Sequence, residues 1–115
     1  MDFDHYTIAL LVKNPHGPDL DEDQAAALQD AHLSHLADLH HAGPLVAAGP
    51  LFGDRLRGLS ILNVDVERAR ELKERDPAVR AGVYAIEAVP WMVPAGAVHF
   101  TPTRFPRSVA EVRGG

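Results

Sequence analysis

Histidine is the side chain in this sequence that is best suited to chemistry. Seven histidines stand among 115 residues, and the chain contains no cysteine. Imidazoles change their charge near neutral pH, transfer protons and bind metal ions. The absence of cysteine excludes disulfides, thiolate zinc sites and cysteine nucleophiles. Four of the histidines lie in one short stretch of the chain, at His32, His35, His40 and His41.

The stretch that carries these four histidines is predicted to be a long helix over residues 21–42. Asp21 and Gln24 have the spacing of a capping box at its start. Gly43 supplies a stop signal at its end, and Pro44 prevents the helix from continuing.

A helical wheel separates the four histidines from one another. With Leu28 as the origin, the inward direction lies near about 50° and His32 falls at about 40°. His35 and His40 lie at the margins of the apolar stripe, and His41 faces solvent. His32 is therefore the histidine that occupies a core position, where a leucine would pack better.

A buried imidazole at His32 has two interpretations. Burial disfavours the charged form, and a neutral core histidine can simply donate to a carbonyl group. A neighbouring carboxylate would instead stabilise the imidazolium and prepare the ring for proton transfer. The candidate carboxylate is Asp76, which follows a second predicted helix over residues 66–75. Because Pro77 comes next, Asp76 also fits as the cap of a turn over residues 77–81, and one carboxyl group can do both.

The predicted elements that position these residues follow the order β-α-β-β-α-β. Periodicity and turn signals predict strands over 5–13, 45–52, 58–64 and 83–89 and helices over 21–42 and 66–75. This order is typical of the ferredoxin-like α+β fold, a four-stranded antiparallel sheet with two helices on one face. We expect one domain over residues 1–93. Residues 94–115 contain three prolines and are predicted to form an irregular or partly ordered C-terminal arm.

The first and last predicted strands carry apolar residues on both faces. Ile8 and Leu10 point to one side of the sheet, and Ala9 and Leu11 point to the other. Two helices cover one face, so the second face needs a partner. We expect a second copy related by two-fold symmetry, which gives a homodimer whose sheets face each other. The alternative is a monomer whose C-terminal arm folds over the open face.

Charge and hydropathy exclude some classes of binding partner for the chain. Eleven basic and sixteen acidic residues give a net charge of −5, which argues against nucleic acid, because phosphates require clustered Lys and Arg. No apolar run approaches the roughly 20 residues that span a bilayer, so no membrane segment is expected. The acidic start of the chain does not predict a signal peptide, and we expect a cytoplasmic protein with a small-molecule ligand.

Two blocks of the sequence carry a family resemblance. The stretch 32–43 (HLSHLADLHHAG) with 45–50 (LVAAGP), and the stretch 76–84 (DPAVRAGVY), resemble the YciI-like, or YCII-related, family. The resemblance extends over roughly residues 5–93 and implies a ferredoxin-like dimeric α+β barrel. It also implies an active site made from a His-Asp pair, here His32 and Asp76. One characterised branch of the family resembles a dehydrochlorinase of chlorinated hydroxyquinols.

Two classes of function stay open from the sequence. In the first, a lyase-, dehydrochlorinase- or isomerase-like enzyme uses His32, oriented by Asp76, to move a proton on a small cyclic or phenolic substrate. In the second, a non-catalytic accessory module holds a metabolite in the same pocket. The residues expected to contact the ligand are Gly49, Pro50, Tyr84 and Trp91. Both aromatic residues of this set also fit as plain core or dimer contacts.

A metal site is a third option. His32 and His35 are three residues apart on the predicted helix, and Asp76 can add a carboxylate. Two imidazoles and one carboxylate are a minimal ligand set, so we expect neither a metal nor a cofactor. Three arginines fit solvated surface, with an anionic ligand as the alternative: Arg55, Arg57 and Arg80.

Overall fold

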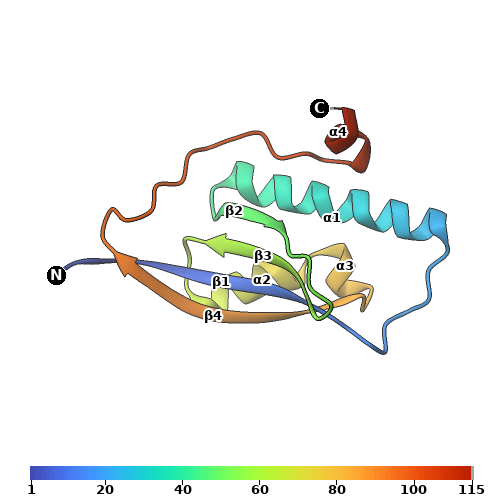
Figure 1. Ribbon diagram of the computed structural model, residues 1–115, viewed down its shortest axis with the longest axis horizontal. Helices are drawn as coiled ribbons and strands as arrows, with labels where there is room; N and C mark the ends of the chain where they lie inside the picture. The colour runs from blue at the N-terminus through green and yellow to red at the C-terminus, as the bar shows by residue number, and fades with distance from the viewer. Residues whose placement is uncertain (115) are drawn as a thin grey trace.

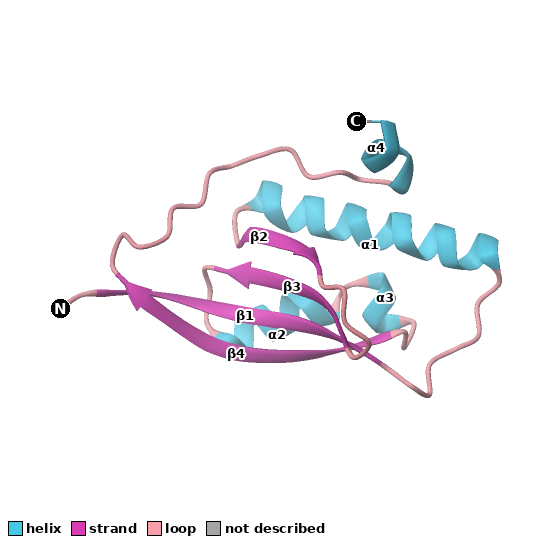
Figure 2. Ribbon diagram, in the orientation of Figure 1, coloured by secondary structure: helices cyan, strands magenta, loops and turns pink. Residues whose placement is uncertain are grey.

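The structure, a computed structural model that describes residues 1–114, consists of an antiparallel sheet with helices packed on one face (Figures 1 and 2). Its elements are β1 (Phe3–Lys13), α1 (Glu22–Ala42), β2 (Leu45–Pro50), β3 (Leu56–Leu62), α2 (Val66–Glu74), α3 (Pro77–Arg80), β4 (Tyr84–Pro94) and α4 (Val109–Gly114). The strand order is β2-β3-β1-β4, and each neighbouring pair is antiparallel. The predicted ferredoxin-like α+β fold is confirmed.

Helix α1 begins and ends at the signals that the sequence predicts. The Asp21 carboxylate accepts a hydrogen bond from the Gln24 backbone N–H at 2.8 Å. The Gln24 side chain in turn accepts one from the Asp21 N–H at 3.1 Å, which completes the capping box. Gly43 ends the helix with φ of 111°, a conformation that a glycine adopts without strain.

The core lies between the sheet and the helices. Alternation along β1 directs Thr7, Ala9 and Leu11 to the helix side, where all three are buried. Ala9 packs in one cluster with apolar side chains from α1, β2, β3 and α2. The members of this cluster are Ala9, Leu39, Leu45, Leu62, Ala69 and Leu72. The helix that carries His32 is therefore fixed directly against the sheet.

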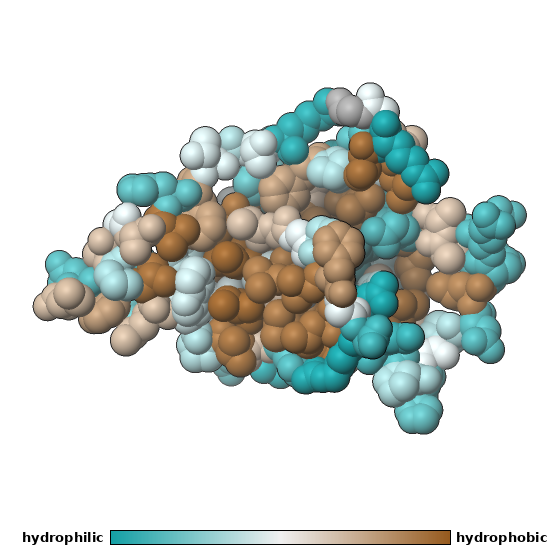
Figure 3. Space-filling model, viewed as in Figure 1, coloured by the Kyte–Doolittle hydropathy of each residue, from teal (hydrophilic) through white to brown (hydrophobic). Residues whose placement is uncertain are grey.

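The opposite face of the sheet is apolar and carries no helix in the described part of the chain. Strand register places Ile8 between Ile61 and Val89, and Leu10 next to Leu59. Val89 is 46% exposed. Figure 3 shows apolar side chains gathered over the strands on this face, which is turned toward the viewer. This surface has the apolar character that the sequence predicts for it.

Strand β4 is longer than the sequence predicts, because it continues through Pro90 to Pro94 instead of ending at residue 89. Its pairing with β1 extends to Phe3 opposite Pro94. A proline lacks an N–H, but β4 lies at the edge of the sheet, where a strand tolerates this loss. Strand β3 begins and ends two residues before its predicted range of 58–64, and β2 ends two residues before its predicted end at Phe52.

The C-terminal segment leaves β4 and returns along α1 to the short helix α4 (Figure 1). Phe100 of this segment packs against Tyr6 with ring centroids 5.2 Å apart, so the segment touches one end of the open face. It then runs along α1 instead of over the rest of that face, whereas the monomeric alternative requires the segment to cover the face. Arg107 forms an ion pair with Asp38 of α1 at 2.7 Å. Phe105 stacks on His40 with ring centroids 4.1 Å apart, so this segment is joined to α1 by polar and aromatic contacts. Within residues 1–114, no helix has the length and apolar character needed to cross a bilayer.

Candidate active site

The centre of the candidate site is a buried pair formed by His32 and Asp76. His32 lies on α1, and Asp76 stands at the N-cap of α3 with no exposed surface. The distance between His32 Nδ1 and Asp76 Oδ2 is 2.6 Å. The other carboxyl oxygen of Asp76, Oδ1, accepts the Ala78 N–H at 2.9 Å. One oxygen thus caps α3, as the position of Asp76 before Pro77 predicts, and the other oxygen lies within hydrogen-bond distance of the His32 imidazole.

This geometry determines which ring nitrogen of His32 carries the proton. Burial alone would raise the pKa of Asp76, but the hydrogen bond and charge of His32, the Ala78 N–H and the Lys73 charge hold that pKa below its ordinary value. Asp76 is therefore ionised at neutral pH and accepts a proton donated by Nδ1. In the neutral imidazole the lone pair is then on Nε2, which has no hydrogen-bond partner among residues 1–114.

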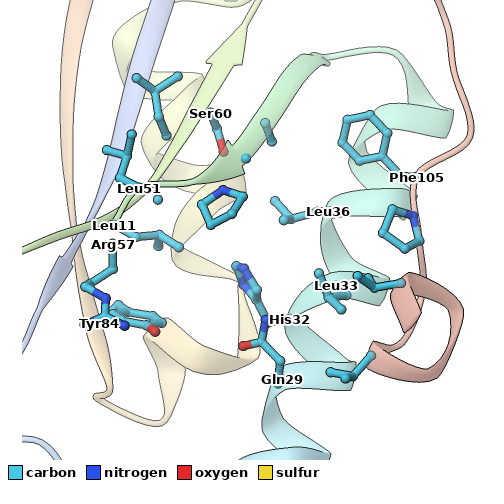
Figure 4. A pocket seen from close by; sticks show the side chains of 18 of the residues that line it. Leu11, Gln29, His32, Leu33, Leu36, Leu51, Arg57, Ser60, Tyr84 and Phe105 are labelled. Atoms are coloured by element: carbon cyan, nitrogen blue, oxygen red, sulfur yellow. The ribbon is translucent and has the colours of Figure 1, made fainter. Parts of the chain in front are cut away.

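His32 lines a cavity of about 600 Å³ between α1, the β2–β3 edge of the sheet and the C-terminal segment. Figure 4 shows its side chain extending from α1 into this space. Leu11, Leu36 and Phe105 are among the apolar side chains of the wall. Imidazole chemistry at His32 would consequently take place in a largely apolar and partly enclosed environment.

The structure places three of the four expected ligand contacts on this cavity. Gly49, Pro50 and Tyr84 line it together with His32, while Asp76 is buried behind the imidazole and does not line it. Trp91 lies elsewhere, opposite Tyr6 in the β1–β4 register, with the two ring centroids 5.9 Å apart. Trp91 is seven residues beyond Tyr84 on β4, so it lies farther along the strand and on the other face of the sheet.

His35 is directed to α2 rather than to the His32–Asp76 pair. Its Nε2 lies 3.1 Å from the carbonyl oxygen of Leu72, and burial lowers its pKa. In the described part of the chain, no three histidine, aspartate or glutamate side chains gather closely enough to hold a metal ion. The set of His32, His35 and Asp76 is therefore not arranged as a metal centre in this structure.

Lys73 is a buried charged residue beside the site, and the sequence analysis does not predict it. Its side chain has no exposed surface, and its Nζ has no hydrogen-bond partner in residues 1–114. Burial lowers the pKa of Lys73 to about 8, although the Asp76 carboxylate opposes this shift. The signal was present in the sequence, because Lys73 follows Val66 and Ala69 at helical spacing on the inward face of α2.

The fold and site together define a ferredoxin-like α+β protein with a histidine–carboxylate pair on a cavity. The chain belongs to the family of proteins with a YCII-related domain, which matches residues 8–92. This membership confirms the resemblance seen in the sequence. The segment that supplies Phe105 to the cavity wall lies outside the matched range.

A solved structure shares this fold. It is the 5-chloro-2-hydroxyhydroquinone dehydrochlorinase from Burkholderia phenoliruptrix AC1100 in complex with 2,5-dihydroxybenzoquinone. The sequence identity is 21% and the TM-score is 0.54, over 75% of this chain and 92% of the dehydrochlorinase. No curated protein sequence matches the chain at a significant level.

Proposed function

We propose that this protein is a small-molecule enzyme in which His32 transfers a proton to or from a small cyclic or phenolic substrate. The observation that carries the proposal is the 2.6 Å contact between His32 Nδ1 and Asp76 Oδ2 beside a cavity that the same imidazole lines. A positioned imidazole with a fixed tautomer is the usual general acid or base of proteins.

In the proposed mechanism Nε2 of His32 accepts a proton from the substrate. The imidazolium that forms is stabilised by Asp76, whose carboxylate is ionised and remains so. In a dehydrochlorination, the substrate loses this proton and a chloride ion, and no oxidant is needed. In an isomerisation, the imidazolium returns the proton to another atom of the substrate. Positioned groups of this kind typically accelerate a reaction by about 10²- to 10⁴-fold.

Two further observations support a lyase-like activity on a ring compound. The solved dehydrochlorinase shares the fold and holds a six-membered quinone. The cavity of this chain is large enough for such a ring, and its walls are mostly apolar. We therefore propose a hydroxylated ring compound, with or without a chlorine substituent, as the substrate.

The experiment that tests the proposal measures chloride release from 5-chloro-2-hydroxyhydroquinone and proton exchange on hydroxylated ring compounds. We expect turnover by the parent chain and its loss in His32→Ala, with the circular dichroism spectrum unchanged. His41→Ala is the matched control, because His41 is an exposed histidine on the same helix. Equal turnover in the parent and His32→Ala would contradict the proposal. Ligand-induced stabilisation without any product, in the parent and in His32→Gln alike, would indicate the accessory binding module instead.

We also propose that the protein acts as a homodimer. Among residues 1–114, no helix covers the apolar sheet face that carries Ile8, Leu59 and Val89. The C-terminal segment touches this face at one end, where Phe100 packs against Tyr6. A second copy packed with two-fold symmetry would cover this face with the same apolar surface. Leu59 lies on this face and also lines the cavity, so the second copy would reach the border of the proposed site.

A further inference from the structure

Arg57 is the one formally charged residue, apart from the titratable His32, among the side chains that line the cavity. Its neighbour Arg55 pairs with Glu87 at 3.3 Å. Arg57 forms no ion pair within residues 1–114, and no aspartate or glutamate lines the cavity beside it. Arg57 is exposed and also borders a neighbouring hollow that Asp19 lines, so its guanidinium stands at the border of a cavity whose other lining residues, apart from His32, are apolar or neutral.

The backbone at Arg57 departs from regular strand pairing. Leu11 pairs with Gly58 and Val12 pairs with Leu56, so Arg57 is an extra residue in a β-bulge of β3. A bulge redirects the side chain of the extra residue and is frequent beside functional sites. The Arg57 carbonyl accepts the Leu51 N–H at 3.1 Å, which secures the bulge to the β2–β3 turn.

Gly58 is part of the same arrangement. A Cβ atom at this position would lie 3.0 Å from Leu11 Cδ1, so a larger residue would require the Leu11 side chain to shift. The bulge beside Gly58 sets the position from which the Arg57 side chain reaches the cavity.

Figure 4 shows Arg57 and Tyr84 on the side of the cavity away from Leu33 and Phe105, with His32 between the two sides. The apolar wall formed by Leu33 and Phe105 suits a ring, and the guanidinium suits an oxyanion because its fork of N–H donors matches a carboxylate. The net charge of the chain is −5, so an anion gains attraction here from a local cation rather than from the protein as a whole.

We propose that the substrate is an anion, a small ring that bears a carboxylate or another ionised oxygen, and that Arg57 binds this oxygen while the ring lies in the apolar part of the cavity. This inference rests on the proposed function, since it assigns the substrate class of the same cavity. It makes Arg57 a specificity-determining residue, which discriminates a charged ring from a neutral ring of equal size.

The test compares benzoate with benzamide, which have nearly the same shape and differ in charge. Affinities are measured by titration with detection by NMR. We expect the parent chain to bind benzoate about tenfold more tightly than benzamide, and Arg57→Gln to lose this tenfold preference while its affinity for benzamide is unchanged. Arg55→Gln is the matched control, and it should keep the preference because Arg55 pairs with Glu87 outside the cavity.

Equal affinity of the parent for the two probes would overturn the inference, as would failure to bind either probe. A preference for benzoate that persists in Arg57→Gln would overturn it as well. These outcomes are distinct from failure of the proposed function, because binding does not require turnover. A chain that releases chloride through His32 and still ignores the charge of its ligand would refute the role of Arg57 alone.

Discussion

Replacing Lys73 with methionine should stabilise the protein near neutral pH. The Lys73 ammonium is buried without a hydrogen-bond partner among the described residues, and its pKa falls from 10.5 to about 8. Each pKa unit corresponds to about 1.4 kcal/mol, so the charged form costs the folded state about 3 kcal/mol. Methionine has a similar length and no charge, and Lys73→Met should recover most of this free energy at pH 7.

The sign of the pH dependence gives a second readout of the same effect. The unfolded chain holds the Lys73 proton more tightly than the folded chain, because the folded pKa of about 8 lies below the ordinary 10.5. The free energy of unfolding should therefore rise between about pH 8 and 10.5 in the parent. Below about pH 8 both states carry the proton, so the contribution of this group is constant. Lys73→Met should lack the rise.

Urea denaturation at pH 7 and pH 10, at one fixed protein concentration, measures both effects. The matched control is Lys13→Met, because Lys13 is the other lysine of the chain and is exposed. The control should change the free energy of unfolding by less than about 0.5 kcal/mol. A Lys73→Met protein that is less stable than the parent at pH 7, or whose free energy of unfolding keeps the same rise with pH, would show that the buried Lys73 charge does not destabilise the fold.

Three further predictions concern the site and the assembly. Asp76→Asn should lower turnover by at least about 10²-fold, because an amide does not stabilise the His32 imidazolium. Steady-state kinetics measure this change, and unchanged turnover would show that Asp76 only caps α3. Phe105→Ala should weaken benzoate binding several-fold in NMR titrations, because the substitution removes the ring that stacks on His40 and lines the cavity. Unchanged affinity for benzoate would show that this part of the cavity wall does not contact the ligand. Val89→Glu should convert a dimer to a monomer in light scattering, because Val89 lies on the apolar open face; a parent chain that is already monomeric would contradict the proposed dimer.

The local signals of the sequence determined much of the fold. The capping box and the glycine stop of α1 appear in the structure as the sequence predicts. His32 was singled out because a polar side chain at the centre of an apolar stripe needs a specific partner. In the structure, the Nδ1 atom of His32 lies within hydrogen-bond distance of Asp76 Oδ2. The capping box, the glycine stop and the inward position of His32 depend on residues a few positions apart, where helix geometry fixes the outcome. The choice of Asp76, 44 positions away, depends instead on its place after the second helix and on the family resemblance.

Other features depend on tertiary contacts that periodicity does not encode. The length of β4 was underestimated because Pro90 acts as a strand breaker unless the strand lies at a sheet edge. Arg57 reaches the cavity from a bulge whose position follows from pairing with β1. Phe105 reaches the cavity through a segment whose path along α1 depends on side-chain contacts such as the Arg107–Asp38 ion pair. Trp91 is expected among the ligand contacts, with a core or dimer contact as the alternative, whereas its strand position places it against Tyr6.

In the proposed site, Asp76 fixes the His32 imidazole with its proton on Nδ1 and leaves Nε2 free to accept a proton at the cavity. Long-range ¹H–¹⁵N NMR of the histidine rings measures this tautomer directly. We predict that neutral His32 is protonated on Nδ1, with a strongly deshielded proton whose resonance disappears in Asp76→Asn, because the two atoms lie 2.6 Å apart. A neutral His32 that carries its proton on Nε2 would contradict the account, because the nitrogen free to act as a base would then face Asp76 instead of the cavity.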